Sequence, residues 1–150
     1  MAVLKLDGAN GVIAYPKKIV TALANGTIAV GDVVKVETDT TQTPDPDTYG
    51  AAGFVVTATA ESNSALALGV AVTAAVDLQE VQIQVSGFNS ACTSAEAISV
   101  GEAVGGSANG DVRQWDTEGA TSQPFAVCVN AFAGTTNDGA ILIIDKGWMG

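Results

Sequence analysis

The residues of this chain with the greatest capacity for chemistry are two cysteines and sixteen carboxylic acids. Histidine is absent, which removes the commonest general base, the commonest metal ligand and the Ser-His and Cys-His nucleophile pairs. The acids are scattered, mostly in expected turns, and no spacing among them indicates a pair held in unlike environments for acid–base work. The sequence therefore predicts a protein without enzymatic activity.

Cys92 and Cys128 lie far apart and form no C-x-x-C pair. Cys128 sits inside an apolar stretch, so we expect a buried free thiol there. A disulfide between the two cysteines stays open, because the sequence does not give the separation of their Cα atoms.

A polar loop, Thr38–Gly53, contains two aspartates that resemble a fragment of a calcium loop. Asp45 and Asp47 lack the glycine at the sixth position and the glutamate at the twelfth that complete this pattern. We therefore predict no metal site and no cofactor. The motifs Val30–Asp32 and Val100–Glu102 are interpreted as structural turns, in which glycine permits the bend and the acid accepts from a neighbouring amide.

Four aromatic residues are candidates for a binding platform: Tyr15, Tyr49, Trp115 and Trp148. In the plainer interpretation Trp115 packs at a sheet edge and Trp148 anchors the tail. In the other, these rings bury against a partner, because Trp and Tyr are enriched at interface anchors.

The formal net charge is −10, with only six lysines and arginines. A surface of this sign repels nucleic-acid backbones and anionic membranes, so we predict neither as a partner. The beginning of the chain carries no apolar core of a secretory signal, and the longest apolar stretch is too short for a membrane helix.

The chain reads as all-β. Ala65–Gly87 predicts two strands joined by the turn Asp77–Glu80, with the alternation of a strand that buries one face and shows water the other. Asn-Gly and Asp-Gly dipeptides recur along the chain and favour hairpins. Ile19–Leu23 is an apolar piece of undecided type, and Phe88–Glu96 is expected to be a loop.

An internal repeat organises these strands. Ile28–Val34 matches Ile98–Val104, Leu68–Ala74 matches Phe125–Ala131, and Val81–Val85 is aligned with Ala140–Ile144. Two similar meanders of about eight short strands would form a small β-barrel or β-sandwich, which removes most exposed sheet edge. We expect an N-terminal arm over residues 1–18 and a single β domain over 19–150, with an exposed loop at 38–53.

Six segments in this order resemble the capsid cement, or head decoration, proteins of tailed phages of the DUF2190 type. They are IAVGDVV, ALGVAV, VQIQVSG, ISVGEAV, NGDV and FAVCVNA, and the resemblance runs from Ala24 to Asp145. It implies a small β-barrel or β-sandwich, usually trimeric, that binds the major capsid protein on the outer surface of the head. It implies a structural virion protein that bridges neighbouring capsomers, with no catalytic residues.

Within this reading, the arm is predicted to make the capsid or subunit contact, because it holds three of the six basic groups. The predicted contact residues are Val3, Leu4, Lys5, Tyr15, Lys17, Lys18 and Trp148. An arm that adds a strand to a neighbour would use backbone pairing for affinity. The alternative is a β-sandwich binding module, displayed on a virion or secreted, that recognises carbohydrate or a cell surface through the Trp and Tyr residues.

Overall fold

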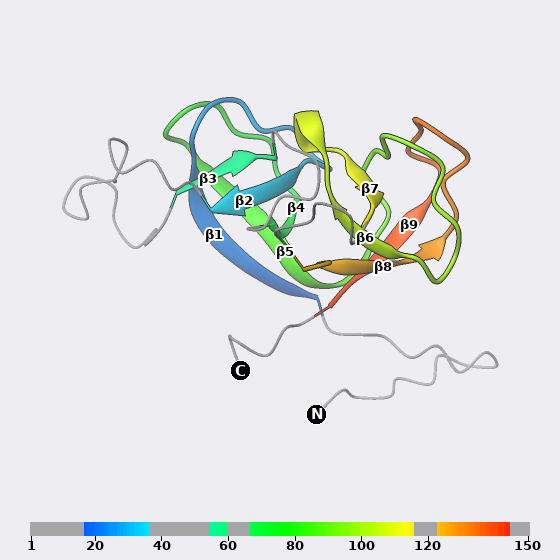
Figure 1. Ribbon diagram of the computed structural model, residues 1–150. Helices are drawn as coiled ribbons and strands as arrows, with labels where there is room; N and C mark the ends of the chain where they lie inside the picture. The colour runs from blue at the N-terminus through cyan, green and yellow to red at the C-terminus, as the bar shows by residue number, and fades with distance from the viewer. Residues whose placement is uncertain (1–16, 37–54, 60–66, 116–122, 145–150) are drawn as a thin grey trace.

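Nine β-strands form one continuous hydrogen-bonded network in the computed structural model (Figure 1), which describes residues 17–36, 55–59, 67–115 and 123–144. The strands are β1 (Lys18–Ala24), β2 (Val33–Val36), β3 (Val55–Ala58), β4 (Ala67–Ala71), β5 (Glu80–Asn89), β6 (Ala103–Gly106), β7 (Val112–Gln114), β8 (Ala126–Asn130) and β9 (Ala140–Ile143). Within the described ranges the only helical segment is the 3-10 turn η2 (Ala108–Gly110), and no helix is long and apolar enough to span a bilayer. The all-β prediction is confirmed.

The first five strands close into a barrel. Their order is β1-β3-β2-β4-β5, and β1 also pairs with β5, which joins the two ends of the sheet. The closing strand β1 lies parallel to β3 and antiparallel to β5. Of the two architectures left open by the sequence, the first half therefore adopts the barrel, and the undecided segment Ile19–Leu23 is a strand because it completes this ring.

The long strand β5 belongs to two rings. Its first part pairs with β1 and β4, while Gly87–Asn89 pairs with β9. Beyond β5, Ser94 forms a parallel bridge with Val112 of β7, as β1 does with β3. The ring β5-β9-β8-β6-β7 is closed by this bridge, and we call the two rings the first and the second barrel. The predicted loop Phe88–Glu96 is corrected at its start, because Phe88 and Asn89 are in β5.

Strand registers confirm the internal repeat. Val33 pairs with Val70 in the first barrel, and Ala103 pairs with Val127 at the matching positions of the second. Ahead of these strands, isolated bridges join Ile28 to Ala75 and, in the second barrel, Ile98 to Phe132. Both predicted matches of the meanders therefore hold residue by residue.

The third match is displaced by one residue. Ile83 of β5 lies opposite Ala71, and Ile141 of β9 lies opposite Cys128, the counterpart of Ala71. Ile83 therefore corresponds to Ile141, and Gln84 to Leu142. Apolar residues follow one another without a break in β9, so its sequence does not fix which of them face inward.

Each barrel encloses its own apolar core, and the two cores correspond position by position. The pairs are Ala22 and Cys92, Ile28 and Ile98, Val34 and Val104, Val56 and Val112, Ala71 and Cys128, Ala75 and Phe132, Ile83 and Ile141, and Val85 and Ile143. In these eight pairs the residue of the second barrel is of equal or larger size, whereas Ala24 and Val81 of the first core correspond to Ser94 and Gly139. The two cores are thus variants of one packing scheme.

Strands β4 and β5 are buried on both faces where the barrels meet. Val70 packs in the second core, whereas its neighbour Ala71 packs in the first. Gln84 and Ser86, expected to face water, are buried on the side of β5 that faces away from the first core. The prediction of one solvated face is wrong here, because a second layer covers it.

The two glycine turns of the repeat have the same hydrogen bonds. Asp32 accepts from the Ala29 amide (2.8 Å), and Glu102 accepts from the Ser99 amide (2.6 Å). Gly31 and Gly101 both have positive φ, at 94° and 91°. The interpretation of these acids as turn residues is confirmed.

Alanine substitutions at these two glycines test how tightly the barrels meet. Both variants lose about 1–2 kcal/mol of unfolding free energy to the left-handed backbone. A Cβ on Gly31 would also lie 2.2 Å from the Ala91 carbonyl oxygen, whereas one on Gly101 meets nothing within 4 Å. We expect Gly31→Ala to cost about 1–3 kcal/mol more than Gly101→Ala in urea unfolding. Equal losses would contradict the close contact.

Candidate interaction surface

The point where β1 begins is also the point where β9 ends. Lys18 lies opposite Ser86 of β5, and the next β5 residue, Gly87, lies opposite Ile143. The start of β1 and the end of β9 meet beside the middle of β5 in Figure 1. Lys18 and Ile143 therefore lie in one region of the surface.

Two of the predicted contact residues are described, and both lie in this region. Lys17 and Lys18 are exposed, and Lys18 is the first residue of β1. The remainder lie outside the described residues: Val3, Leu4, Lys5, Tyr15 and Trp148. The contact role of the arm stays a prediction.

Large apolar side chains are exposed around the same point. Ile19 of β1 is 45% exposed, Phe88 of β5 48%, and Ile144, just after β9, 44%. Phe88 lies directly opposite Leu142 in β9. The interpretation of the sequence missed these residues. The usable signal was that Leu142 and Ile144 replace the polar Gln84 and Ser86 of the repeat.

A buried polar network holds β5 where it passes from one barrel to the other. The Gln84 amide nitrogen donates to the carbonyls of Ser86 (3.1 Å) and Phe88 (2.8 Å). Its side-chain oxygen accepts from Asn89 Nδ2 (3.1 Å), and Asn89 Oδ1 in turn accepts from the Ala91 amide (2.9 Å). An unpaired buried amide would cost about 1–3 kcal/mol. These bonds remove that cost and fix the bend of the strand.

A second contact joins the barrels away from β5. The Thr59 hydroxyl donates to the Ser107 carbonyl (2.6 Å), and the Gly110 amide donates to the Thr59 carbonyl (3.0 Å). A Cβ on Gly110 would lie 2.9 Å from Asp32, so the η2 turn sits directly against the glycine turn of the first barrel. The described parts of the two barrels are therefore tied together at both places.

Two carboxyl groups lie near this second contact. Burial raises the pKa of Asp32, partly offset by its bond from Ala29, and burial together with the charge of Asp32 raises the pKa of Asp111. The folded protein therefore holds these protons more tightly than the unfolded chain. Their contribution to stability falls as the pH rises through their titration, so at neutral pH both charges are unfavourable.

Neutralising Asp111 should stabilise the protein at neutral pH. We expect Asp111→Asn to raise the melting temperature at pH 7 by roughly 1–3 °C, a small gain because the group is partly solvated. The gain should vanish as the pH is lowered and the wild-type carboxyl becomes protonated. Glu80→Gln, an exposed acid in β5, serves as the control for net charge. A gain that persists at low pH would contradict the assignment of the gain to the partly buried negative charge of Asp111.

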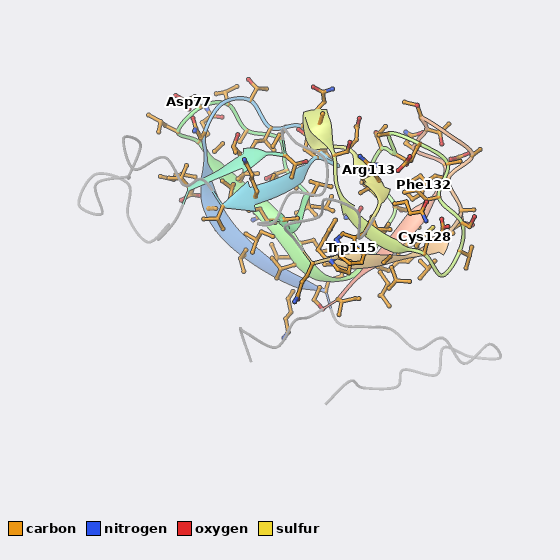
Figure 2. All side chains as sticks on the ribbon, in the orientation of Figure 1. Asp77, Arg113, Trp115, Cys128 and Phe132 are labelled. Atoms are coloured by element: carbon orange, nitrogen blue, oxygen red, sulfur yellow. The ribbon has the colours of Figure 1, made fainter. Side chains whose placement is uncertain are left out.

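Both cysteines are free, buried thiols, as expected for Cys128. Figure 2 labels Cys128 and Phe132, which belong to the second core. Cys128 Sγ lies 3.2 Å from the Asn130 carbonyl and 3.7 Å from the Ile98 carbonyl. Because Cys92 and Cys128 occupy the positions of Ala22 and Ala71, their role is to fill the larger core.

These thiols should be chemically inert in the folded protein. Burial raises the pKa of Cys92 from 9.0 to about 12, and it also raises the pKa of Cys128. At a given pH below 9, this higher pKa corresponds to a thiolate fraction about 1,000-fold lower for Cys92. We expect a disulfide reagent at pH 8 to modify the native protein far more slowly than the protein in urea. Cys92→Ala isolates Cys128, and rapid modification of the native chain would contradict the assignment.

Of the remaining sequence candidates, Trp115 alone lies within the described residues. Trp115 is half-buried, and its backbone amide donates to the Ala103 carbonyl (2.8 Å). Asp45, Asp47 and Tyr49 fall outside the described residues. Among the residues that are described, no cluster of three or more cysteines and acids is placed to hold a metal ion.

Comparison with solved structures gives a likeness in fold. No protein-family model matches the chain, and no curated protein is similar to it at a significant level. Among solved structures, the chain is similar to the N base of the head fiber gp8.5 of bacteriophage phi29. The likeness has a TM-score of 0.58 at 16% identity and covers 86% of this chain and 95% of that one. It establishes a shared fold across nearly the whole of both chains.

Proposed function

We propose that this protein is a structural component of a phage head that decorates the outer surface of the capsid. The observation that carries the proposal is the shared fold with the base of a phage head fiber, over nearly the full length of both chains. The segments that resemble head decoration proteins in sequence extend from Ala24 to Asp145, and so cover both barrels. The likeness in fold and the resemblance in the order of these segments therefore favour the same class of protein.

The described surface suits a binding role. The two barrels are joined by a shared strand and by the Thr59 and Ser107 contact, which makes a stiff body. Lys17, Lys18 and the exposed Ile19 lie together at the beginning of β1. On a lattice of identical sites, modest contacts of this kind add through effective concentration. The acidic balance of the chain would keep decorated particles apart.

In this proposal the major capsid protein is the partner, and the protein assembles with itself as a trimer. The arm over residues 1–18 makes the contact with the shell. Because Lys18 is the first residue of β1 and pairs with Ser86, a deletion that ends at residue 16 should leave both barrels intact. The protein acts by bridging capsomers and performs no chemical step.

Deletion of residues 2–16 should abolish decoration without unfolding the protein. We expect wild-type protein to co-sediment to saturation with heads assembled without it, and the truncated protein to reach less than about one tenth of that occupancy, since the strand pairing that carries affinity is gone. Lys17→Ala with Lys18→Ala is the milder variant and should weaken binding several-fold. Circular dichroism checks that each variant keeps its β spectrum.

Full occupancy by the truncated protein would contradict the role of the arm. Failure of the wild-type protein to bind heads under the same conditions would overturn the proposed function itself.

A further inference from the structure

The two barrels have the same design, yet among the described residues only the outer sheet face of the first barrel is covered. In the first barrel the glycine turn lies against the second barrel, since a Cβ on Gly31 would meet the Ala91 carbonyl at 2.2 Å. At the counterpart, Gly101, nothing lies within 4 Å of such a Cβ. The repeat therefore provides an internal comparison between a covered and an uncovered copy of one surface.

The difference extends across the sheet. In the first barrel, Val33, Val70 and Gln84 lie opposite one another on β2, β4 and β5, and all three are fully buried. Their counterparts on β6, β8 and β9 also lie opposite one another: Ala103, Val127 and Leu142. These three are only half-buried, and the row continues to Phe88, which is 48% exposed.

The uncovered row carries apolar residues at β9, where the covered row carries polar residues at β5. Gln84 and Ser86, which are buried, correspond to Leu142 and Ile144, which are half-buried and 44% exposed. A solvent-facing strand normally carries polar residues on its outer side, so the opposite trend indicates a surface that is covered in the assembled state. We call this surface the end face, and it consists of Phe88, Ala103, Val127, Leu142 and Ile144.

We propose that the end face docks a second copy of this chain, in the way that the first barrel is covered by the second. The inference deepens the self-association in the proposed function and rests on it. The argument for the occupant is the continuity of the repeat: the one covering unit that the structure places on this type of face is another barrel of the same design. A second copy supplies such a barrel without any new recognition element.

The contact has a defined polarity. The segment that covers the first barrel includes Ala91, which corresponds by the repeat to Thr21 of β1 in the first barrel, and Thr21 is exposed. The second copy would therefore approach with the β1 side of its first barrel. Because two different surfaces meet, the contact is head-to-tail, and a head-to-tail contact that closes gives a ring.

The test replaces two residues of the end face by the residue types found at the matching positions of the first barrel. Leu142→Gln with Ile144→Ser introduces the residue types present at Gln84 and Ser86, and Val30→Ser with Val76→Ser removes two exposed apolar residues from the first barrel as the control. Sedimentation equilibrium over a range of concentrations measures association, against a single-chain mass of 15.0 kDa. We expect wild-type and control proteins to associate alike, and the end-face variant to associate at least about 10-fold more weakly at an unchanged β spectrum.

Thr21→Arg tests the other side of the contact. It should weaken association as the end-face variant does, and wild-type association after this change would overturn the head-to-tail arrangement. A wild-type chain that stays at the single-chain mass, or an end-face variant that associates normally, would overturn the proposal.

Head binding separates this inference from the proposed function. An end-face variant that is monomeric like the wild type but fails to bind heads would assign the face to the shell and refute docking of a second copy. An oligomer that depends on the end face but does not bind heads would keep the inference and refute the proposed function.

Discussion

The structure depends on one constraint: β5 is a member of two closed rings at once. A strand shared in this way must satisfy the pairing register of β1 and β4 along its first part and of β9 along its last three residues. The buried bonds between Gln84, Asn89 and the backbone hold the strand at the change of partner. Glycine also lets the neighbouring strand β4 approach β5 closely, since a Cβ on Gly69 would lie 2.1 Å from the Gln84 carbonyl oxygen. The two barrels thus share the backbone of β5 as well as the side chains that pack on it.

The repeat explains why two cores of different size fit one design. Ala22, Ala71 and Ala75 in the first core become Cys92, Cys128 and Phe132 in the second. Core volume can vary when the pairing of the strands is kept, because packing tolerates hydrophobic exchange as long as the total volume is filled. The cysteines are therefore understood as core residues, and the absence of redox chemistry in the proposed role follows from their burial.

Local sequence predicted most of the fold, because its signals act over a few residues. Glycine turns, Asn-Gly dipeptides and alternation fix where strands begin and turn, and the matches of Ile28 to Ile98 and of Leu68 to Phe125 agree with the observed registers. The predictions that were wrong concern features that depend on contacts between distant parts of the chain. The burial of Gln84 and Ser86 depends on a second barrel that local alternation does not reveal. The register of β9 was displaced because its apolar run offers two equivalent choices of inward face.

The candidate surface shows the same division. Lysines and aromatic residues predicted a contact at the ends of the chain. Phe88, Leu142 and Ile144 carry no such signal as single residues. Their meaning comes from comparison: Leu142 stands where the repeat has Gln84, yet Gln84 is buried and Leu142 is not. Fully burying an exposed leucine is favourable by about 1.5–3 kcal/mol, and the half-buried Leu142 would gain a part of this on association. The polar Gln84 and Ser86 lie under the second barrel, whereas the apolar Leu142 and Ile144 lie on the end face, and this contrast is the basis of the proposal that a second copy docks there.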